Sequence, residues 1–190
     1  YEIGTGDWSS DVALPILAGE NILAGKRILV VDDEQDILDT LIEMLDECEI
    51  ETAYTFESAE ELLKTKVYDA VILDIMGVRG FDLLELATRK KMPALMLTAH
   101  GLTPDNLIGS IKLGAKSYIP KDKIDALDLY LKEIFLAQEK GIEKSGNWFA
   151  HLGSFFDEHF GYGWKNKDKK FWSEFDKTYQ VSKDELERLL

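Results

Sequence analysis

The segment ILVVDDE, residues 28–34, is the most informative part of the chain, because four apolar residues run directly into three acids. Three later segments share this design of an apolar run ending in a polar residue: AVILD at 70–74, ALMLT at 94–98 and SYIPK at 117–121. Apolar runs of this length are typical of strands that are buried on both faces of a parallel sheet.

Between these runs lie stretches with apolar residues at helical spacing, first Ile37, Leu38, Leu41, Ile42 and Leu45, and later Phe81, Leu83, Leu84 and Leu86. Strands that alternate with amphipathic helices predict a doubly wound α/β domain. We expect a parallel sheet of five strands with five helices, the last running from about Lys123 to Lys140. Ligands of such a sheet bind beyond the carboxyl ends of its strands.

Composition divides the 190 residues into three parts. Residues 1–25 contain four acidic and no basic residues, and we expect a linker, an arm packed on the domain, or an arm that docks on a partner. Residues 26–140 form the α/β domain. Residues 141–190 hold 11 of the 20 aromatic residues and predict a helical extension. Fifty residues cannot easily bury that many aromatic rings alone, so some should pack on the domain or on another chain.

Charge and hydropathy exclude several classes of protein. With 22 basic and 36 acidic residues the net charge is −14, which makes tight non-specific binding to nucleic acid unfavourable. No apolar stretch approaches the roughly 20 residues of a membrane span, and the first 25 residues do not predict a secretory signal. A single cysteine, Cys48, allows no intramolecular disulfide. We therefore expect a cytoplasmic protein that does not act on membranes.

Polar residues follow four of the predicted strands: Asp32 and Asp33, Asp74, Thr98 and Lys121. The carboxyl ends of parallel strands share one edge of a sheet, so these side chains should converge. Two carboxylates about 4 Å apart repel by about 4 kcal/mol at an effective dielectric constant near 20, so three of them need compensating cations. A lysine and a hard divalent cation would supply this positive charge, and oxygen ligands favour Mg²⁺.

A carboxylate beside Mg²⁺ and a lysine is an activated nucleophile for a phosphoryl group, and the product is an acyl phosphate. In that chemistry Lys121 and the hydroxyl of Thr98 would bind the phosphoryl oxygens. Each residue taken singly also has a structural interpretation, since Asp32 and Asp33 could cap the following helix. The five residues together, each at the end of the correct strand, favour the phosphoryl-transfer site.

The segments ILVVDDE at 28–34, AVILDIMGVRG at 70–80, ALMLTAH at 94–100 and SYIPK at 117–121 resemble the receiver domain of two-component response regulators. The resemblance covers about 115 of the 190 residues. It implies the strand order 2-1-3-4-5. It also implies a phosphoprotein that catalyses only its own phosphorylation and dephosphorylation.

The resemblance assigns roles at the acidic edge. Asp74 is implied as the phosphoacceptor. Asp33, Asp74 and the backbone carbonyl of Met76 are implied as direct ligands of Mg²⁺, with Asp32 assisting through water.

The resemblance also assigns residues around that edge. Thr98 and Tyr118 are implied as the switch pair, in which the threonine moves toward the phosphoryl group while the aromatic ring turns inward. Met76 and His100 occupy the two positions that tune the lifetime of the phosphoryl group in this family. A methionine cannot orient an attacking water, so we expect a long-lived acyl phosphate.

Two positions depart from the family pattern. Gly77 stands where the family commonly has proline, which is expected to loosen the loop after Asp74. Asp122 follows Lys121 where the family commonly has proline, and Pro120 precedes the lysine instead. We expect Asp122 to compete for the ammonium group of Lys121.

The predicted function is a response regulator that accepts a phosphoryl group from a sensor histidine kinase or a histidine phosphotransfer protein and signals by protein contact. Nothing after residue 140 resembles a DNA-binding or enzymatic output domain. The segment Leu127–Leu136 has more apolar residues than one buried face of a helix can use. Either the C-terminal tail packs on this helix, or the chain forms a homodimer through it. Alternatives are a phosphorelay intermediate, a scaffold that is never phosphorylated, and a flavin-binding protein of the same topology.

Overall fold

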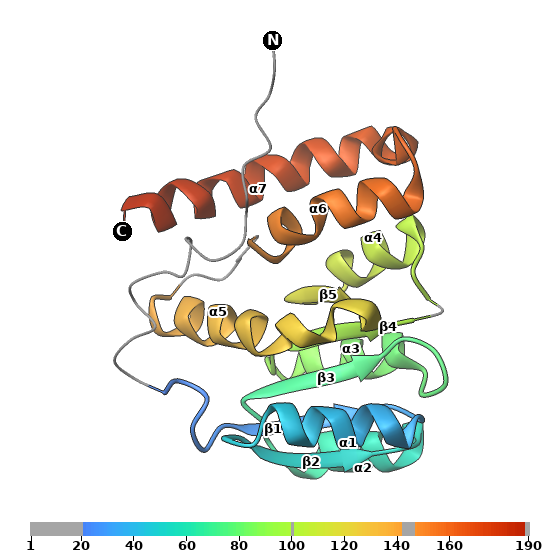
Figure 1. The fold of residues 1–190 in the computed structure, drawn as a ribbon, viewed down its shortest axis with the longest axis vertical. Coiled ribbons are helices and arrows are strands. Elements are labelled where there is room, and N and C mark those ends of the chain that lie inside the picture. Colours follow the sequence, from blue (N-terminus) through green and yellow to red (C-terminus); the bar gives the residue numbers. More distant parts are fainter. Residues whose placement is uncertain (1–20, 100, 142–146, 189–190) are drawn as a thin grey trace.

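The computed structural model describes residues 21–99, 101–141 and 147–188, and it contains a five-stranded parallel sheet. The strand order is β2-β1-β3-β4-β5, which confirms the predicted doubly wound fold (Figure 1). The strands are β1 (Arg27–Val31), β2 (Glu49–Ala53), β3 (Ala70–Asp74), β4 (Ala94–Thr98) and β5 (Ser117–Pro120).

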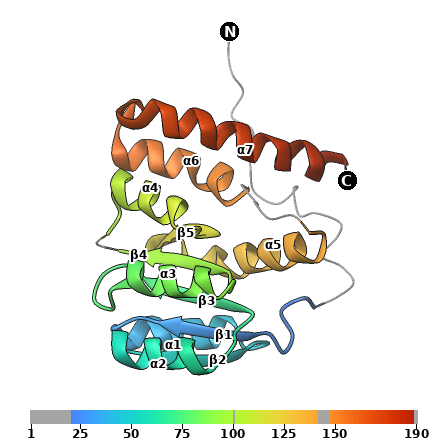
Figure 2. The same ribbon diagram turned by 180° about the vertical axis from the view of Figure 1, so that it is seen from behind.

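Five helices connect and cover the strands: α1 (Gln35–Met44), α2 (Phe56–Thr65), α3 (Gly80–Arg89), α4 (Pro104–Lys112) and α5 (Leu127–Glu139). Helices α1 and α5 lie on one face of the sheet (Figure 1), and α3 lies on the other, which Figure 2 shows from behind. Two helices begin at threonine caps, since the side chains of Thr55 and Thr103 accept backbone hydrogen bonds from Ser58 and Asn106.

The core follows from the apolar runs. Every residue of β3 and β4 is buried, as expected for central strands covered by helices on both faces. Within the described residues β2 pairs with β1 alone, at the edge of the sheet, and its sequence EIETA alternates glutamates with Ile50 and Thr52. No apolar run marks β2, which is why the sequence predicted its existence without placing it.

The start of the last helix differs from the prediction. Residues Lys121–Ala126 form a 3₁₀ segment, η2, in which Lys123 has non-helical angles (φ −117°, ψ 21°), and α5 begins only at Leu127. The residues of η2 are half-buried or exposed, although the side chain of Lys121 reaches into the acidic edge of the sheet. Tertiary packing supplies most of the stability of a short helix, and here it begins at Leu127. The predicted start at Lys123 was therefore one turn too early.

The described end of the N-terminal arm packs on the domain. Leu23 is buried, and its carbonyl accepts a hydrogen bond from the thiol of Cys48 at 3.4 Å. Gly25 donates its backbone N–H to Glu47 at 2.9 Å. Residues 1–20, the rest of the predicted arm, lie outside the described residues.

The C-terminal extension forms α6 (Asn147–Phe160), a 3₁₀ segment η3 (Trp164–Asp168) and α7 (Lys169–Arg188). The two helices form a further layer beside α4 and β5, at the end of the molecule opposite β2 (Figures 1 and 2). Aromatic side chains fill the space within this layer and beneath it: Trp148, Phe149, Phe156, Trp164, Trp172 and Phe175 are all buried. The extension therefore packs its rings on the domain, as the composition suggested.

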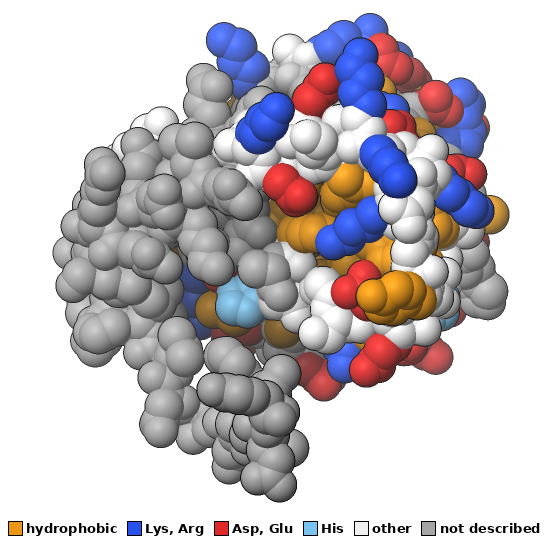
Figure 3. Space-filling model, turned by 90° about the horizontal axis from the view of Figure 1, so that it is seen from above, with side chains coloured by type: hydrophobic (Ala, Val, Ile, Leu, Met, Phe, Trp, Pro, Cys, Tyr) orange, Lys and Arg blue, Asp and Glu red, His pale blue; other side chains and the backbone are white. Residues whose placement is uncertain are grey.

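Lysines cover the outer side of this aromatic layer. Figure 3 shows lysine and arginine side chains gathered around an apolar patch on this end of the molecule. The ammonium group of Lys165 lies 4.8 Å from the ring centre of Phe149, 5.4 Å from that of Trp172 and 5.5 Å from that of Trp164. Lys165 thus stabilises the cluster by cation–π contacts. Among the described helices, none combines the length and the apolar composition needed to cross a lipid bilayer.

Candidate functional site

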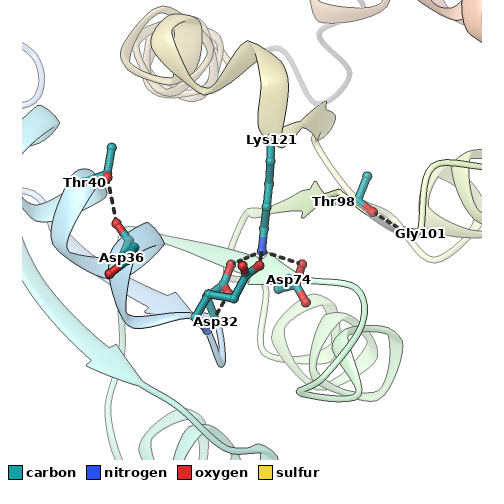
Figure 4. Close-up of polar contacts among 8 residues, drawn as sticks. Asp32, Asp36, Thr40, Asp74, Thr98, Gly101 and Lys121 are labelled. Atoms are coloured by element: carbon teal, nitrogen blue, oxygen red, sulfur yellow. Dashed lines mark hydrogen bonds and ion pairs between the residues drawn. The ribbon is translucent and has the colours of Figure 1, made fainter.

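The ends of the strands bring the predicted polar residues to one edge of the sheet. Asp32 directly follows β1, Asp74 ends β3 opposite Leu97, and Thr98 ends β4 opposite Pro120. Figure 4 shows Lys121 reaching from the end of β5 toward the carboxylates of Asp32 and Asp74. The parallel topology alone creates this convergence, because all five strands point the same way.

Lys121 is the central cation of the site. Its Nζ lies 2.8 Å from Oδ2 of Asp32, 2.7 Å from Oε1 of Glu34 and 3.3 Å from Oδ1 of Asp74. The side chains of Lys121, Asp32 and Asp74 are at most 8% exposed, so the two ion pairs among them are shielded from water, whereas the side chain of Glu34 is 55% exposed. The other carboxylate oxygen of Asp32, Oδ1, accepts a hydrogen bond from the backbone N–H of Glu34 at 3.0 Å, so Asp32 also orders the start of α1.

Three carboxylates at this edge could hold a cation. One ligand oxygen from each of Asp32, Asp33 and Asp74 lies within 4.8 Å of the others, and Asp33 is exposed while the other two are buried. Carboxylate oxygens with an open, solvated side suit a hard ion such as Mg²⁺. The carbonyl of Met76 accepts the backbone N–H of Val78, which leaves its second lone pair for a ligand.

Burial dominates the electrostatics of the site. It raises the pKa of Asp74 to about 6, an effect that Lys121 opposes and the charge of Asp32 reinforces. Burial also raises the pKa of Asp32 above its ordinary value. For Lys121, burial lowers the pKa, but hydrogen bonds from its ammonium group to Asp32 and Glu34 outweigh this effect and raise it. The ammonium group of Lys121 therefore stays protonated, while the carboxylate of Asp74 is more basic than that of an ordinary aspartate.

Glycine is required at two positions of the loop after β3. Gly77 has φ +59°, which proline cannot adopt, and a Cβ at this position would overlap the carboxyl group of Asp33. A Cβ at Gly80 would overlap the backbone carbonyl of Asp74. The departure from the family pattern at Gly77 therefore makes room for the exposed aspartate.

Thr98 and Tyr118 both bind the same residue, Gly101. Oγ1 of Thr98 accepts the backbone N–H of Gly101 at 2.9 Å, and this bond directs the hydroxyl away from Lys121 (Figure 4). The hydroxyl of Tyr118 donates to the carbonyl of Gly101 at 2.8 Å. The ring of Tyr118 is fully buried.

The structure thus brings together Asp32, Asp33, Asp74 and Lys121, and it places Thr98 at the same edge. Met76 has an exposed side chain in the adjoining loop, and His100 lies outside the described residues.

Glu34 is the site residue that the sequence analysis missed. Its only signal was its place as the third acid of ILVVDDE, and it holds Lys121 at 2.7 Å. Within the described residues, the ion pairs of Lys121 are with Asp32, Glu34 and Asp74. The prediction that Asp122 competes for this lysine was wrong, because Asp122 lies on η2 with an exposed side chain.

A parallel sheet of this order with three acids and a lysine at its carboxyl edge is the arrangement that the sequence predicted for a receiver domain. Residues 28–132 match the response regulator receiver domain, and the chain belongs to this family. It is a signalling domain of two-component systems, and the predicted identity of the domain is confirmed.

Individual proteins and solved structures also match the receiver part of the chain. The chain is 38% identical over 100 residues to the transcriptional regulatory protein CpxR of Klebsiella pneumoniae, covering 50% of this chain and 42% of that protein. A CheY-like receiver domain protein of Methanospirillum hungatei is 30% identical with a TM-score of 0.56, covering 62% of this chain and 99% of that one. The receiver domain of DrrB, solved in a BeF3-activated form, is 25% identical with a TM-score of 0.50, covering 59% and 97%.

The chain spans less than half the length of the first curated relatives that it matches. These matches cover about half of this chain.

Proposed function

We propose that this chain is a response regulator whose Asp74 accepts a phosphoryl group from a phosphohistidine of a sensor histidine kinase or a histidine phosphotransfer protein. The observation that carries this proposal is the contact of Lys121 with the buried carboxylate of Asp74 at 3.3 Å, beside two further acids. A buried carboxylate with a pKa of about 6 is a better nucleophile than an ordinary aspartate.

The transfer exchanges one bond for another. A carboxylate oxygen of Asp74 attacks phosphorus, the P–N bond to the donor histidine breaks, and the electron pair leaves with the imidazole nitrogen. Charge develops on the phosphoryl oxygens, and Lys121 is placed to neutralise one of them. Thr98 would bind another after releasing Gly101.

Magnesium would be held by the carboxylates of Asp33 and Asp74 and the carbonyl of Met76, with Asp32 assisting through water. When bound, Mg²⁺ neutralises charge on the acids and on the phosphoryl group. Among the described residues, Lys121 pairs with Asp32 and Asp74 but not with the neighbouring Asp33, and this excess of negative charge supports the assignment.

The output is proposed to be protein contact in the cytoplasm. Residues 26–140 act as the receiver and residues 141–190 as a helical extension that carries no DNA-binding or catalytic function. The packing of α6 against β5 supports the tail, rather than a second protomer, as the cover of this side of the receiver. Every apolar residue of Leu127–Leu136 is at least half-buried, which supports the same interpretation.

Phosphorylation by a small donor tests this function. The full chain is incubated with acetyl phosphate and Mg²⁺, and its intact mass is measured. We expect a gain of one phosphoryl group that disappears with EDTA and in Asp74→Asn. Asp39→Asn, which changes an exposed acid on α1, is the matched control and should be labelled like the wild type. Labelling that persists in Asp74→Asn, or a wild type that is never labelled, contradicts the proposal.

A further inference from the structure

The ammonium group of Lys121 is fully used by three carboxylates. Its Nζ lies 2.7 Å from Oε1 of Glu34, 2.8 Å from Oδ2 of Asp32 and 3.3 Å from Oδ1 of Asp74. Figure 4 shows the side chain of Lys121 ending among these acids. An ammonium group has one N–H for each of the three acceptors and no more. A phosphoryl oxygen that binds Lys121 must therefore compete with a carboxylate that already holds it.

The three carboxylates differ in how easily they can release the lysine. The side chain of Asp32 is 1% exposed, so its release would leave a buried charge unpaired, which is costly. Asp74 remains beside the phosphoryl group that it accepts. The side chain of Glu34 is 55% exposed, so a released carboxylate returns to water at little cost. Glu34 is therefore the partner that yields to an incoming phosphoryl oxygen.

Glu34 is also close enough to act on a charged ligand through space. The distances from Nζ of Lys121, 2.7 Å to Oε1 of Glu34 and 3.3 Å to Oδ1 of Asp74, add to 6.0 Å, and the two oxygens cannot lie further apart than this sum. A unit charge about 6 Å away changes the affinity for a charged ligand about 3-fold even at a dielectric constant of about 80.

The negative charge of Glu34 acts in opposite directions on the two ligands of this edge. It repels the phosphoryl oxygens and occupies the cation that would bind them, so it weakens the binding of the anion. It attracts Mg²⁺, whose proposed ligands include the neighbouring carboxylates of Asp33 and Asp74. The same side chain therefore favours the metal and disfavours the phosphoryl group.

We propose that Glu34 is a positioning residue of the acidic edge: it holds Lys121 in the unphosphorylated chain, competes with the phosphoryl group for that ammonium, and strengthens the binding of Mg²⁺. This inference rests on the proposed function of Asp74, and it deepens that function by naming the residue that restrains it. Glu34 acts through Lys121, and phosphorylation is held back until the lysine exchanges this carboxylate for a phosphoryl oxygen.

Two binding measurements on the full chain test the opposite signs. The affinity for Mg²⁺ is measured by calorimetry, and the affinity for beryllofluoride, a phosphoryl mimic, by fluorine NMR at saturating Mg²⁺, both at low ionic strength. In Glu34→Gln we expect beryllofluoride to bind at least about 3-fold more tightly than in the wild type, and Mg²⁺ at least about 3-fold more weakly. An unchanged or opposite shift for either ligand overturns the proposal. A folding defect would weaken both ligands together, so it cannot produce the expected result.

Glu43→Gln is the matched control for the loss of one negative charge. Glu43 is an exposed glutamate on α1, about 2.5 helical turns beyond Glu34. This variant should bind both ligands like the wild type. Equal shifts in Glu43→Gln and Glu34→Gln would assign the effect to net charge, and they would contradict a specific role of Glu34.

The rate of phosphorylation provides a second readout. At saturating Mg²⁺, acetyl phosphate, an anionic donor, should label Glu34→Gln at an initial rate at least about 3-fold above that of the wild type. Labelling at the wild-type rate or below it would show that Glu34 does not restrain the reaction. If the wild type neither binds beryllofluoride nor is labelled, the proposed function itself falls. If the wild type does both and Glu34→Gln behaves identically, only the role of Glu34 is lost.

Discussion

At the scale of single residues, Asp74 combines reactivity with a cost in stability. Burial raises its pKa from the ordinary 3.8 to about 6, so the folded chain binds this proton more tightly than the unfolded chain. The unfolding free energy contributed by Asp74 is therefore highest below pH 4 and falls as the pH rises toward 6. At neutral pH the metal-free protein carries the full cost of the buried charge.

Replacing Asp74 by asparagine should therefore stabilise the metal-free protein. The variant removes a buried charge and keeps the side-chain shape, so at pH 7.5 we expect a gain of about 1–3 kcal/mol in unfolding free energy. Urea unfolding in EDTA at pH 5 and pH 7.5 measures it, and the gain should be smaller at pH 5. A variant that is less stable than the wild type at pH 7.5 would show that the charge of Asp74 stabilises the fold.

Met76 gives a second prediction at this scale. Its side chain is 53% exposed in the loop after β3 and has no group that can orient a water. Met76→Asn introduces such a group, so the acyl phosphate should hydrolyse several-fold faster than in the wild type. The decay of labelled protein after removal of acetyl phosphate measures both rates. A wild-type half-life of only seconds would contradict the long lifetime predicted for methionine.

At the scale of elements, the sequence predicted the buried strands well, but it placed neither the edge strand β2 nor the start of α5 correctly. β1, β3 and β4 are built on apolar runs of four residues, and β5 contains a shorter run, so their places follow from burial. β2 lies at the edge and alternates with glutamates, so tertiary pairing rather than its own pattern defines it. The start of α5 depends on where packing begins, which periodicity could not distinguish from the preceding η2.

The contact between α5 and α6 includes a titratable pair, His151 and Glu133. A hydrogen bond between His151 and Glu133 raises the pKa of this histidine above its ordinary value, although burial opposes the shift. A raised histidine pKa means that the bond stabilises the folded state fully below about pH 6.5 and that this contribution is lost as the pH rises through the folded pKa.

We therefore expect α6 to exchange its amides faster, relative to the intrinsic rate, at pH 8.5 than at pH 6. Glu133→Gln removes the charge that binds the imidazolium, so it should abolish most of this difference. Hydrogen exchange of residues 147–160 in both proteins is the measurement. An equal pH dependence in the variant would assign the effect to another group.

At the scale of the whole molecule, a receiver and an aromatic extension share one packed body. Asp32, Asp74, Thr98 and Lys121 could be placed from the sequence because the parallel topology fixes where each strand ends. The partner of the aromatic residues could not, since rings at helical spacing fit several surfaces equally well. Only the coordinates place Phe156 against Tyr118.

The most direct test is to locate the phosphoryl group on the chain. The protein is labelled with acetyl phosphate and Mg²⁺, the acyl phosphate is reduced with borohydride, and the product is mapped by peptide mass spectrometry. Reduction converts a phosphorylated aspartate to homoserine, and we predict homoserine at position 74. Homoserine at position 32 or 33 instead, or at no position, would contradict Asp74 as the acceptor.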